Sequence, residues 1–352
     1  MLRAVSVSIL VGGIALSPPV AEAQAPVHVP PEAMAPARYH SFPSLRELAA
    51  EEQSWVEKRV TEVIPALMRE YGVEMWVISQ REYAEDPVFF AITSPTTFAA
   101  RRRSIYVFHD RGPDEGVERL ALGGTTQGGI YTIYRSERPA PTGGDAELWG
   151  DEQWRLFREL VEDRDPANIV LNIDEHHAFA DGLHAGEREA LERALGPWVD
   201  RVRREPRLAI DFIAHRIPEM MPRYRQMMET VHAMISEAFS NAVIEPGVTT
   251  TDDVVWWMRE RIREMGMQSW FQPSVSVQRA GALPPGAPVV PERGDVVLRP
   301  STWHSIELQA TVRVPEWGDR PVRCRQEEEA YLDEAGERHW VFRRQEQFHI
   351  IW

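Results

Sequence analysis

The sequence predicts two domains: an α/β domain over residues 45–204 and an abbreviated α+β domain over 205–352. Strand-like apolar runs alternate with helical segments over about 160 residues, which is typical of a sheet covered by helices. From Glu205 onward long helices come first and strands follow only after Gly266, which is the order of an α+β domain. The chain is long enough for each domain to bury its own core.

The spacing of apolar residues predicts the helices and strands of the first domain. Helical spacing over 44–71 predicts a helix that stops at Gly72, with Pro65 as a place where it kinks. Continuous apolar runs predict buried strands over 73–78, 104–108, 119–122, 130–134 and 168–173. Two further helices are predicted over 149–162 and 178–195, and the second stops at Gly196-Pro197.

The second domain opens with a predicted helix over 208–243 whose methionines, at helical spacing, belong to a core. The turn Glu245-Pro246-Gly247 ends it. Thr250 or Thr251 then caps a second helix, whose first turn carries acidic residues that suit the positive end of the helix dipole. The strands predicted after it cover 274–278, 295–298, 305–314, 322–332 and 340–351.

Composition excludes several classes of protein. The 352 residues are 43% hydrophobic and 26% charged, as in soluble globular proteins. Acidic residues outnumber basic ones 54 to 39, giving a formal charge of −15, which argues against nucleic acid as a partner. The single cysteine, Cys324, excludes an intramolecular disulfide and a cysteine-based zinc site. No internal repeat or phosphate-binding glycine motif occurs.

The N-terminus predicts export. Arg3, the apolar run 4–16 and Ala21-Glu22-Ala23 indicate a signal peptide over 1–23, cleaved after Ala23. The alternatives are an uncleaved or a lipid-anchored N-terminus, and no cysteine follows the run as a lipoprotein requires. Residues 24–44 are rich in proline and alanine and predict an extended lead-in. We therefore expect a mature protein that is periplasmic or extracellular and not held in a membrane.

One group of possible metal ligands lies in the first domain. If the predicted helix begins early, His177, Asp181 and His184 fall at i, i+4 and i+7 on one face. Histidine and aspartate at a helix start are also common as caps and as solvated side chains. A serine nucleophile is not supported, because no Gly-x-Ser-x-Gly elbow occurs.

A second group lies near the C-terminus, where Glu307 and the run Glu327-Glu328-Glu329 stand in strand-like surroundings. Two carboxylates on adjacent strands would make an oxygen-rich metal site. The competing interpretation is a solvated acidic edge, with Glu307 paired to an arginine.

Short motifs give this chain a resemblance to a known family. They are Ile244-Glu245-Pro246-Gly247-Val248-Thr249, Ser269-Trp270-Phe271-Gln272-Pro273, Val277-Gln278-Arg279, Gly294-Asp295-Val296-Val297, Ser305-Ile306-Glu307, Val314-Pro315-Glu316-Trp317-Gly318, and Arg325-Gln326-Glu327 with Gly336. Pieces of the first domain also match, including Met75-Trp76-Val77-Ile78, Arg81-Glu82-Tyr83 and Asp86-Pro87. In this order they resemble the M24 metallopeptidases, the Xaa-Pro aminopeptidase and creatinase family. The resemblance implies a creatinase-like N-terminal domain, a pita-bread-like C-terminal domain, short peptides as substrates and a possible homodimer.

The resemblance also implies a pair of divalent metals, manganese or zinc, held by two Asp, one His and two Glu. Glu307 and Glu327 match the two Glu positions. The positions of the two Asp hold Pro300 and Thr311 instead, and no His-x-x-Gly-His stretch occurs between Asp295 and Glu307. His304 is a weak substitute, because three residues before Glu307 on a strand it points to the opposite face. The family's upstream catalytic histidine has no counterpart between Phe271 and Gly294.

These gaps leave several hypotheses. The chain is a metal-dependent aminopeptidase completed by other residues or by a partner subunit, or a non-catalytic relative that binds peptides or dimerises. It is otherwise the truncated product of a deletion or of a misjoined gene model. A creatinase-like activity ranks last, because the histidine that it needs is missing. With the residues placed here, we expect the chain by itself to be a poor or inactive peptidase.

Overall fold

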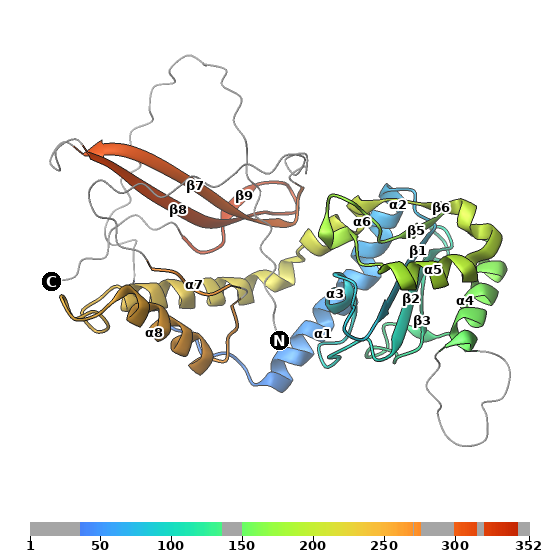
Figure 1. Cartoon of the computed structure of the whole chain (residues 1–352), viewed down its shortest axis with the longest axis horizontal. Helices are drawn as coiled ribbons and strands as arrows, with labels where there is room; N and C mark the ends of the chain where they lie inside the picture. The colour runs from blue at the N-terminus through green and yellow to red at the C-terminus, as the bar shows by residue number, and fades with distance from the viewer. Residues whose placement is uncertain (1–35, 136–149, 270, 276–298, 315–319, 344–352) are drawn as a thin grey trace, which may run out of the picture. The chain divides into compact units, whose positions relative to one another are not determined.

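The computed structural model describes residues 36–135, 150–269, 271–275, 299–314 and 320–343. It divides the chain into two compact units, one of residues 43–217 and one of residues 1–42 with 218–352 (Figure 1). None of the helices in the described ranges is long and apolar enough to cross a membrane. The lead-in, the signal peptide and the expected strand 295–298 lie wholly or partly outside the described residues.

The unit of residues 43–217 is a mixed α/β fold around a six-stranded sheet of order β4-β3-β2-β1-β5-β6. Its strands are β1 (Met75–Arg81), β2 (Arg103–Asp110), β3 (Val117–Leu122), β4 (Thr132–Ile133), β5 (Ile169–Leu171) and β6 (Val202–Arg203). Its α-helices are α1 (Leu45–Lys58), α2 (Ile64–Glu70), α3 (Phe89–Ile92), α4 (Asp151–Arg164), α5 (Ala185–Leu195) and α6 (Pro206–Ala214). β1 pairs antiparallel with β2 and parallel with β5, so the sheet is mixed.

Both faces of β1 are buried, which explains its continuous apolar run. One face packs Met75 and Val77 into a core shared with α4 and α5. The other face carries Trp76, whose ring lies 6.1 Å from that of Phe212 in α6. Residues 206–214, expected at the start of the second domain, therefore pack with the first unit. The domain boundaries predicted from the sequence stay a prediction.

The predicted helix 44–71 forms as α1 and α2 with a π-helical turn, Arg59–Val63, between them. Pro65 lies at the start of α2, where a missing N–H is tolerated. Ser44 caps α1 in a reciprocal capping box with Glu47. The wide turn places Arg59 so that its guanidinium donates to the Phe212 carbonyl and lies over the Phe212 ring.

Two predicted helices are shorter than expected. The helix expected from 178 begins at Ala185, after a 3₁₀ turn at Ala178–Ala180. Residues 181–184 stay extended because the Leu183 amide donates to the Asn172 carbonyl and the Gly182 backbone passes close to Asp86. The helix expected over 208–243 is broken, because Ile217 precedes a proline and the Arg216 side chain donates to the last carbonyls of α6.

The unit that contains residues 218–352 has two helices, α7 (Met221–Ala238) and α8 (Thr251–Glu264), and a hairpin sheet in its described part. Ala238 of α7 packs with Val254 and Met258 of α8 in a small core. The strands β7 (Thr302–Val314), β8 (Arg320–Leu332) and β9 (Arg338–Trp340) are antiparallel in that order. Of the strand expected over 274–278, residues 274 and 275 lie outside any strand and the rest lies outside the described residues. Of the strand expected over 340–351, Trp340 ends β9, residues 341–343 lie outside any strand, and the rest lies outside the described residues.

Candidate functional site

The two predicted metal ligands are on neighbouring strands. β7 and β8 pair over their full length, and Glu307 stands directly opposite Glu327 in the register. Residues directly opposite in an antiparallel pair lie on the same face of the sheet, with Cβ atoms about 5 Å apart. The backbone register therefore brings together the two glutamates whose motifs are 20 residues apart in the sequence.

Neighbouring groups on this face hold the β8 carboxylates. The Ser305 hydroxyl donates to Glu327 Oε1 at 2.9 Å, although Glu327 is exposed. The Trp303 indole N–H donates to Glu329. The Trp303 ring packs edge-on against Tyr224 of α7, with centroids 4.6 Å apart. Glu329 is thus engaged by an indole and Glu327 by a hydroxyl.

The residues present do not fit the pair of metals that the resemblance implies. Pro300 lies in the turn before β7, and Thr311 stands opposite Arg323 in the ladder, so neither position offers a carboxylate. His304 Nε2 lies 2.6 Å from Thr302 Oγ1, in a hydrogen bond. Both residues lie on the face of the sheet opposite Ser305. Two glutamates without a bridging aspartate or an imidazole are too few donors to hold two ions tightly.

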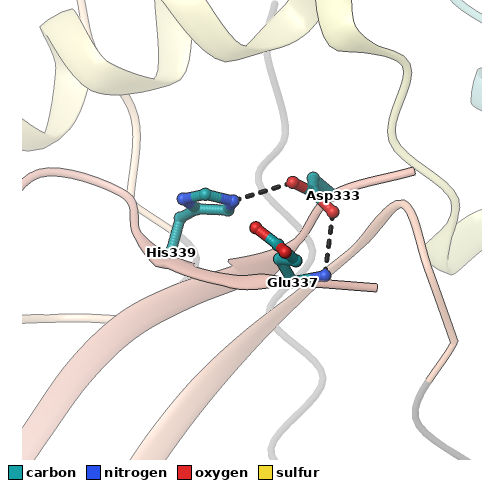
Figure 2. A group of neighbouring side chains, drawn as sticks. All are labelled: Asp333, Glu337 and His339. Atoms are coloured by element: carbon teal, nitrogen blue, oxygen red, sulfur yellow. Dashed lines mark hydrogen bonds and ion pairs between the residues drawn. The ribbon is translucent and has the colours of Figure 1, made fainter. Parts of the chain in front are cut away.

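A different group of three possible ligands lies at the turn between β8 and β9. One ligand atom from each of Asp333, Glu337 and His339 lies within 4.8 Å of the others, the one such group among the residues described (Figure 2). His339 Nε2 bonds Asp333 Oδ2 at 2.8 Å, and Asp333 Oδ1 accepts from the amides of Ala335 and Glu337. The His339 bond and the two amides hold the pKa of Asp333 below its ordinary value.

The hydrogen bonds of the turn are enough to hold Asp333, Glu337 and His339 close together without a metal. Asp333 closes the turn through its side chain and through backbone bonds with Gly336 and Glu337. The His339 ring stacks on Tyr331 with centroids 5.1 Å apart, and Tyr331 accepts from Arg225 at 2.8 Å. Tyr331 is four residues from Glu327 along β8, which is about 14 Å in an extended strand. The turn group and the Glu307–Glu327 pair therefore cannot share one ion.

The candidate ligands of the first domain do not gather on a helix face. His177 and His184 flank a 3₁₀ turn and an extended stretch, because the helix starts later than expected. His177 Nδ1 instead bonds Asp174 Oδ2 at 3.0 Å, and the Asp181 carboxylate accepts from the Asp174 amide. The two aspartates accept from backbone amides of this loop, and neither the 3₁₀ turn nor α5 has a side-chain cap.

Sequence reasoning missed the turn group. Asp333 and Gly336 mark a tight turn, and Glu337 and His339 alternate after it at strand spacing. Only the return of β9 beside β8 places the imidazole next to the aspartate, and that pairing is not visible in the sequence.

Comparisons with known proteins give likeness in structure alone. No family model and no curated protein matches the chain. An X-Pro aminopeptidase from Thermotoga maritima MSB8 is similar at 12% identity and a TM-score of 0.38, over 76% of this chain. The chain spans 61% of that enzyme's length. A Xaa-Pro dipeptidase from Bacillus anthracis is similar at 11% identity and a TM-score of 0.45, over 86% of this chain and 100% of the other. At these scores the likeness carries no argument about function.

Proposed function

We propose that this chain is an exported Xaa-Pro aminopeptidase-like protein of the M24 metallopeptidase type, impaired in hydrolysis because three of its five metal ligands are missing. The observation that carries the proposal is the register of Glu307 opposite Glu327. Two motifs that the resemblance assigns to metal ligands stand on adjacent strands, where paired ligands must stand.

The missing ligands set the expected chemistry. In metal-dependent hydrolysis a tightly held divalent ion supplies an activated water at neutral pH. Here Glu327 and Glu307 offer oxygen ligands alone, and the Ser305 hydroxyl already donates to Glu327. We therefore expect weak binding of Mn²⁺ or Zn²⁺ and slow or absent cleavage of N-terminal bonds next to proline. Short peptides, a homodimer and a periplasmic or extracellular location belong to the same proposal.

Metal binding and hydrolysis test the proposal on the purified mature chain. Titration with Mn²⁺ should show weak binding that Glu307→Gln with Glu327→Gln reduces at least about tenfold, because even the loss of a group that only orients a ligand costs about 10- to 100-fold in metal affinity. Glu328→Gln is the matched control, because Glu328 lies on the other face of β8. Equal Mn²⁺ binding by the double variant and the control would contradict the assignment of the two glutamates. Two tightly bound ions with turnover of an Xaa-Pro peptide would contradict the impairment.

The same missing ligands favour a second candidate, a non-catalytic relative that binds peptides or dimerises. This candidate predicts binding of an Xaa-Pro peptide in the presence of EDTA. Calorimetry with the peptide, with and without EDTA, distinguishes the two candidates. Peptide binding that requires Mn²⁺ favours the metal-dependent protein, and binding that persists in EDTA favours the non-catalytic relative.

A further inference from the structure

The N-terminal strap, defined here as residues 36–42, lies along the helix pair of the C-terminal unit (Figure 1). Its backbone amides at Arg38 and His40 donate to side chains of α7: the first to Glu229 Oε1 at 3.4 Å, the second to Thr230 Oγ1 at 3.2 Å. His40 Nε2 also bonds Glu229 Oε2 at 2.5 Å, and the Arg38 guanidinium lies 3.6 Å from the same carboxylate. α7 thus contacts alternate residues of an extended segment.

Tyr39, which lies between Arg38 and His40 in the strap, contacts both α7 and α8. The Tyr39 hydroxyl donates to Glu237, the second-last residue of α7. The Arg261 guanidinium of α8 lies 4.7 Å from the Tyr39 ring centroid and pairs with the same glutamate at 3.4 Å. A phenol is suited to this position, because its ring meets a cation and its hydroxyl meets a carboxylate.

The strap is held by polar contacts at the surface. None of residues 36–42 is buried, whereas Thr230 beneath them is completely buried. A segment with few buried apolar contacts opens locally at a smaller free energy than the whole unit needs to unfold. The residues that hold the strap form one strip, defined here as Glu229, Thr230, Glu237 and Arg261, and this strip binds an extended segment of the chain.

We propose that the strap is a displaceable occupant of this strip, and that the strip binds an extended peptide with a cationic residue, an aromatic residue and a histidine in sequence. Glu229 selects the cation and the imidazole, Thr230 accepts a backbone amide, and Glu237 with Arg261 selects the phenol. The strap then masks the strip in the manner of an autoinhibitory segment. The inference requires neither metal nor hydrolysis, so it stands apart from the proposed function.

Hydrogen exchange on the full mature chain tests the displacement. The amides of Arg38 and His40 should exchange faster than the central amides of α7, under conditions where the protein stays folded. Tyr39→Phe removes one hydrogen bond and keeps the ring, and it should speed exchange of these two amides about fivefold. Glu260→Gln, an exposed change on α8 away from the strap, should leave them unchanged. Exchange of the strap only together with α7, in the wild type and in Tyr39→Phe alike, would overturn the inference.

A synthetic peptide tests the strip itself. The peptide Ala-Pro-Ala-Arg-Tyr-His-Ser-Phe-Pro, which copies residues 35–43, should bind the full chain and increase exchange of the strap amides in proportion to its saturation. The same peptide with alanine in place of tyrosine should bind at least fivefold more weakly. Failure of the copied peptide to bind at millimolar concentration, or equal binding of the two peptides, would overturn the inference.

Discussion

At the scale of single residues, Asp86 carries the most unusual chemistry in the first unit. It is 2% exposed, and burial raises the pKa of its carboxyl to about 6 even though the Val88 amide and the Asn172 side chain donate to it and lower the pKa. The neighbouring Asp181 raises it further. Asn172 donates to both oxygens, at 3.0 and 2.9 Å, and accepts from the Trp76 indole, so this carboxyl ties the loop after β1 to the loop after β5.

The raised pKa predicts that Asp86 destabilises the fold at neutral pH. The folded state binds the proton of this carboxyl more tightly than the unfolded chain does. The free energy of unfolding should therefore increase by about 2 to 3 kcal/mol through this group as pH falls from about 7 toward 4. Asp86→Asn removes the titration, so the thermal midpoint of the wild type should rise relative to that of the variant between pH 7.5 and pH 5. Asp114→Asn, in an exposed turn, should follow the wild type at every pH. A parallel pH dependence in Asp86→Asn and wild type would contradict the assignment.

At the scale of elements, the sequence predicts those helices and strands that depend on local residue patterns. It fails to predict boundaries and groups that depend on contacts between distant segments. The apolar runs of β1, β2 and β3 and the helix α4 are confirmed, because each run is buried as its pattern requires. The start of α5 was wrong because Gly182 is held against Asp86, a contact between distant segments. The motifs of Glu307 and Glu327 lie opposite one another on β7 and β8, and their role as metal ligands stays a prediction. The group at Asp333 could not be predicted, since it depends on how β9 returns beside β8.

The start of α8 shows what a cap contributes. The sequence left Thr250 and Thr251 as alternatives, and the structure confirms Thr250, whose hydroxyl accepts from the Asp253 amide at 3.2 Å while the Asp253 carboxylate accepts from Thr250. Thr250→Ala should lower the free energy of unfolding of the C-terminal unit by about 1 kcal/mol, and Thr251→Ala, one residue later, by less. Urea unfolding followed by tryptophan fluorescence measures both. An equal loss in the two variants would show that the cap is not the cause.

At the scale of the whole molecule, each unit has an apolar core in the part of the chain that the structure describes. In the first unit fifteen buried residues from the sheet, α4 and α5 form one continuous core. In the second, α7 and α8 bury a smaller core, and Trp303 packs on Tyr224. The candidate metal ligands lie on a hairpin face and at the turn between β8 and β9, outside both of these cores.

Chelation therefore should not unfold the protein. Structural metal sites contribute folding free energy outright, so their removal lowers the thermal midpoint, but here EDTA should leave the midpoint unchanged within about 1 °C. Phe157→Ala is the matched positive control, because Phe157 is completely buried in the first core and its loss costs about 3 to 5 kcal/mol. Differential scanning calorimetry of the mature chain, with and without EDTA, compares the two effects. A fall in midpoint with EDTA as large as that of Phe157→Ala would show that a metal supports the fold, and would favour the complete metal site that the described residues lack.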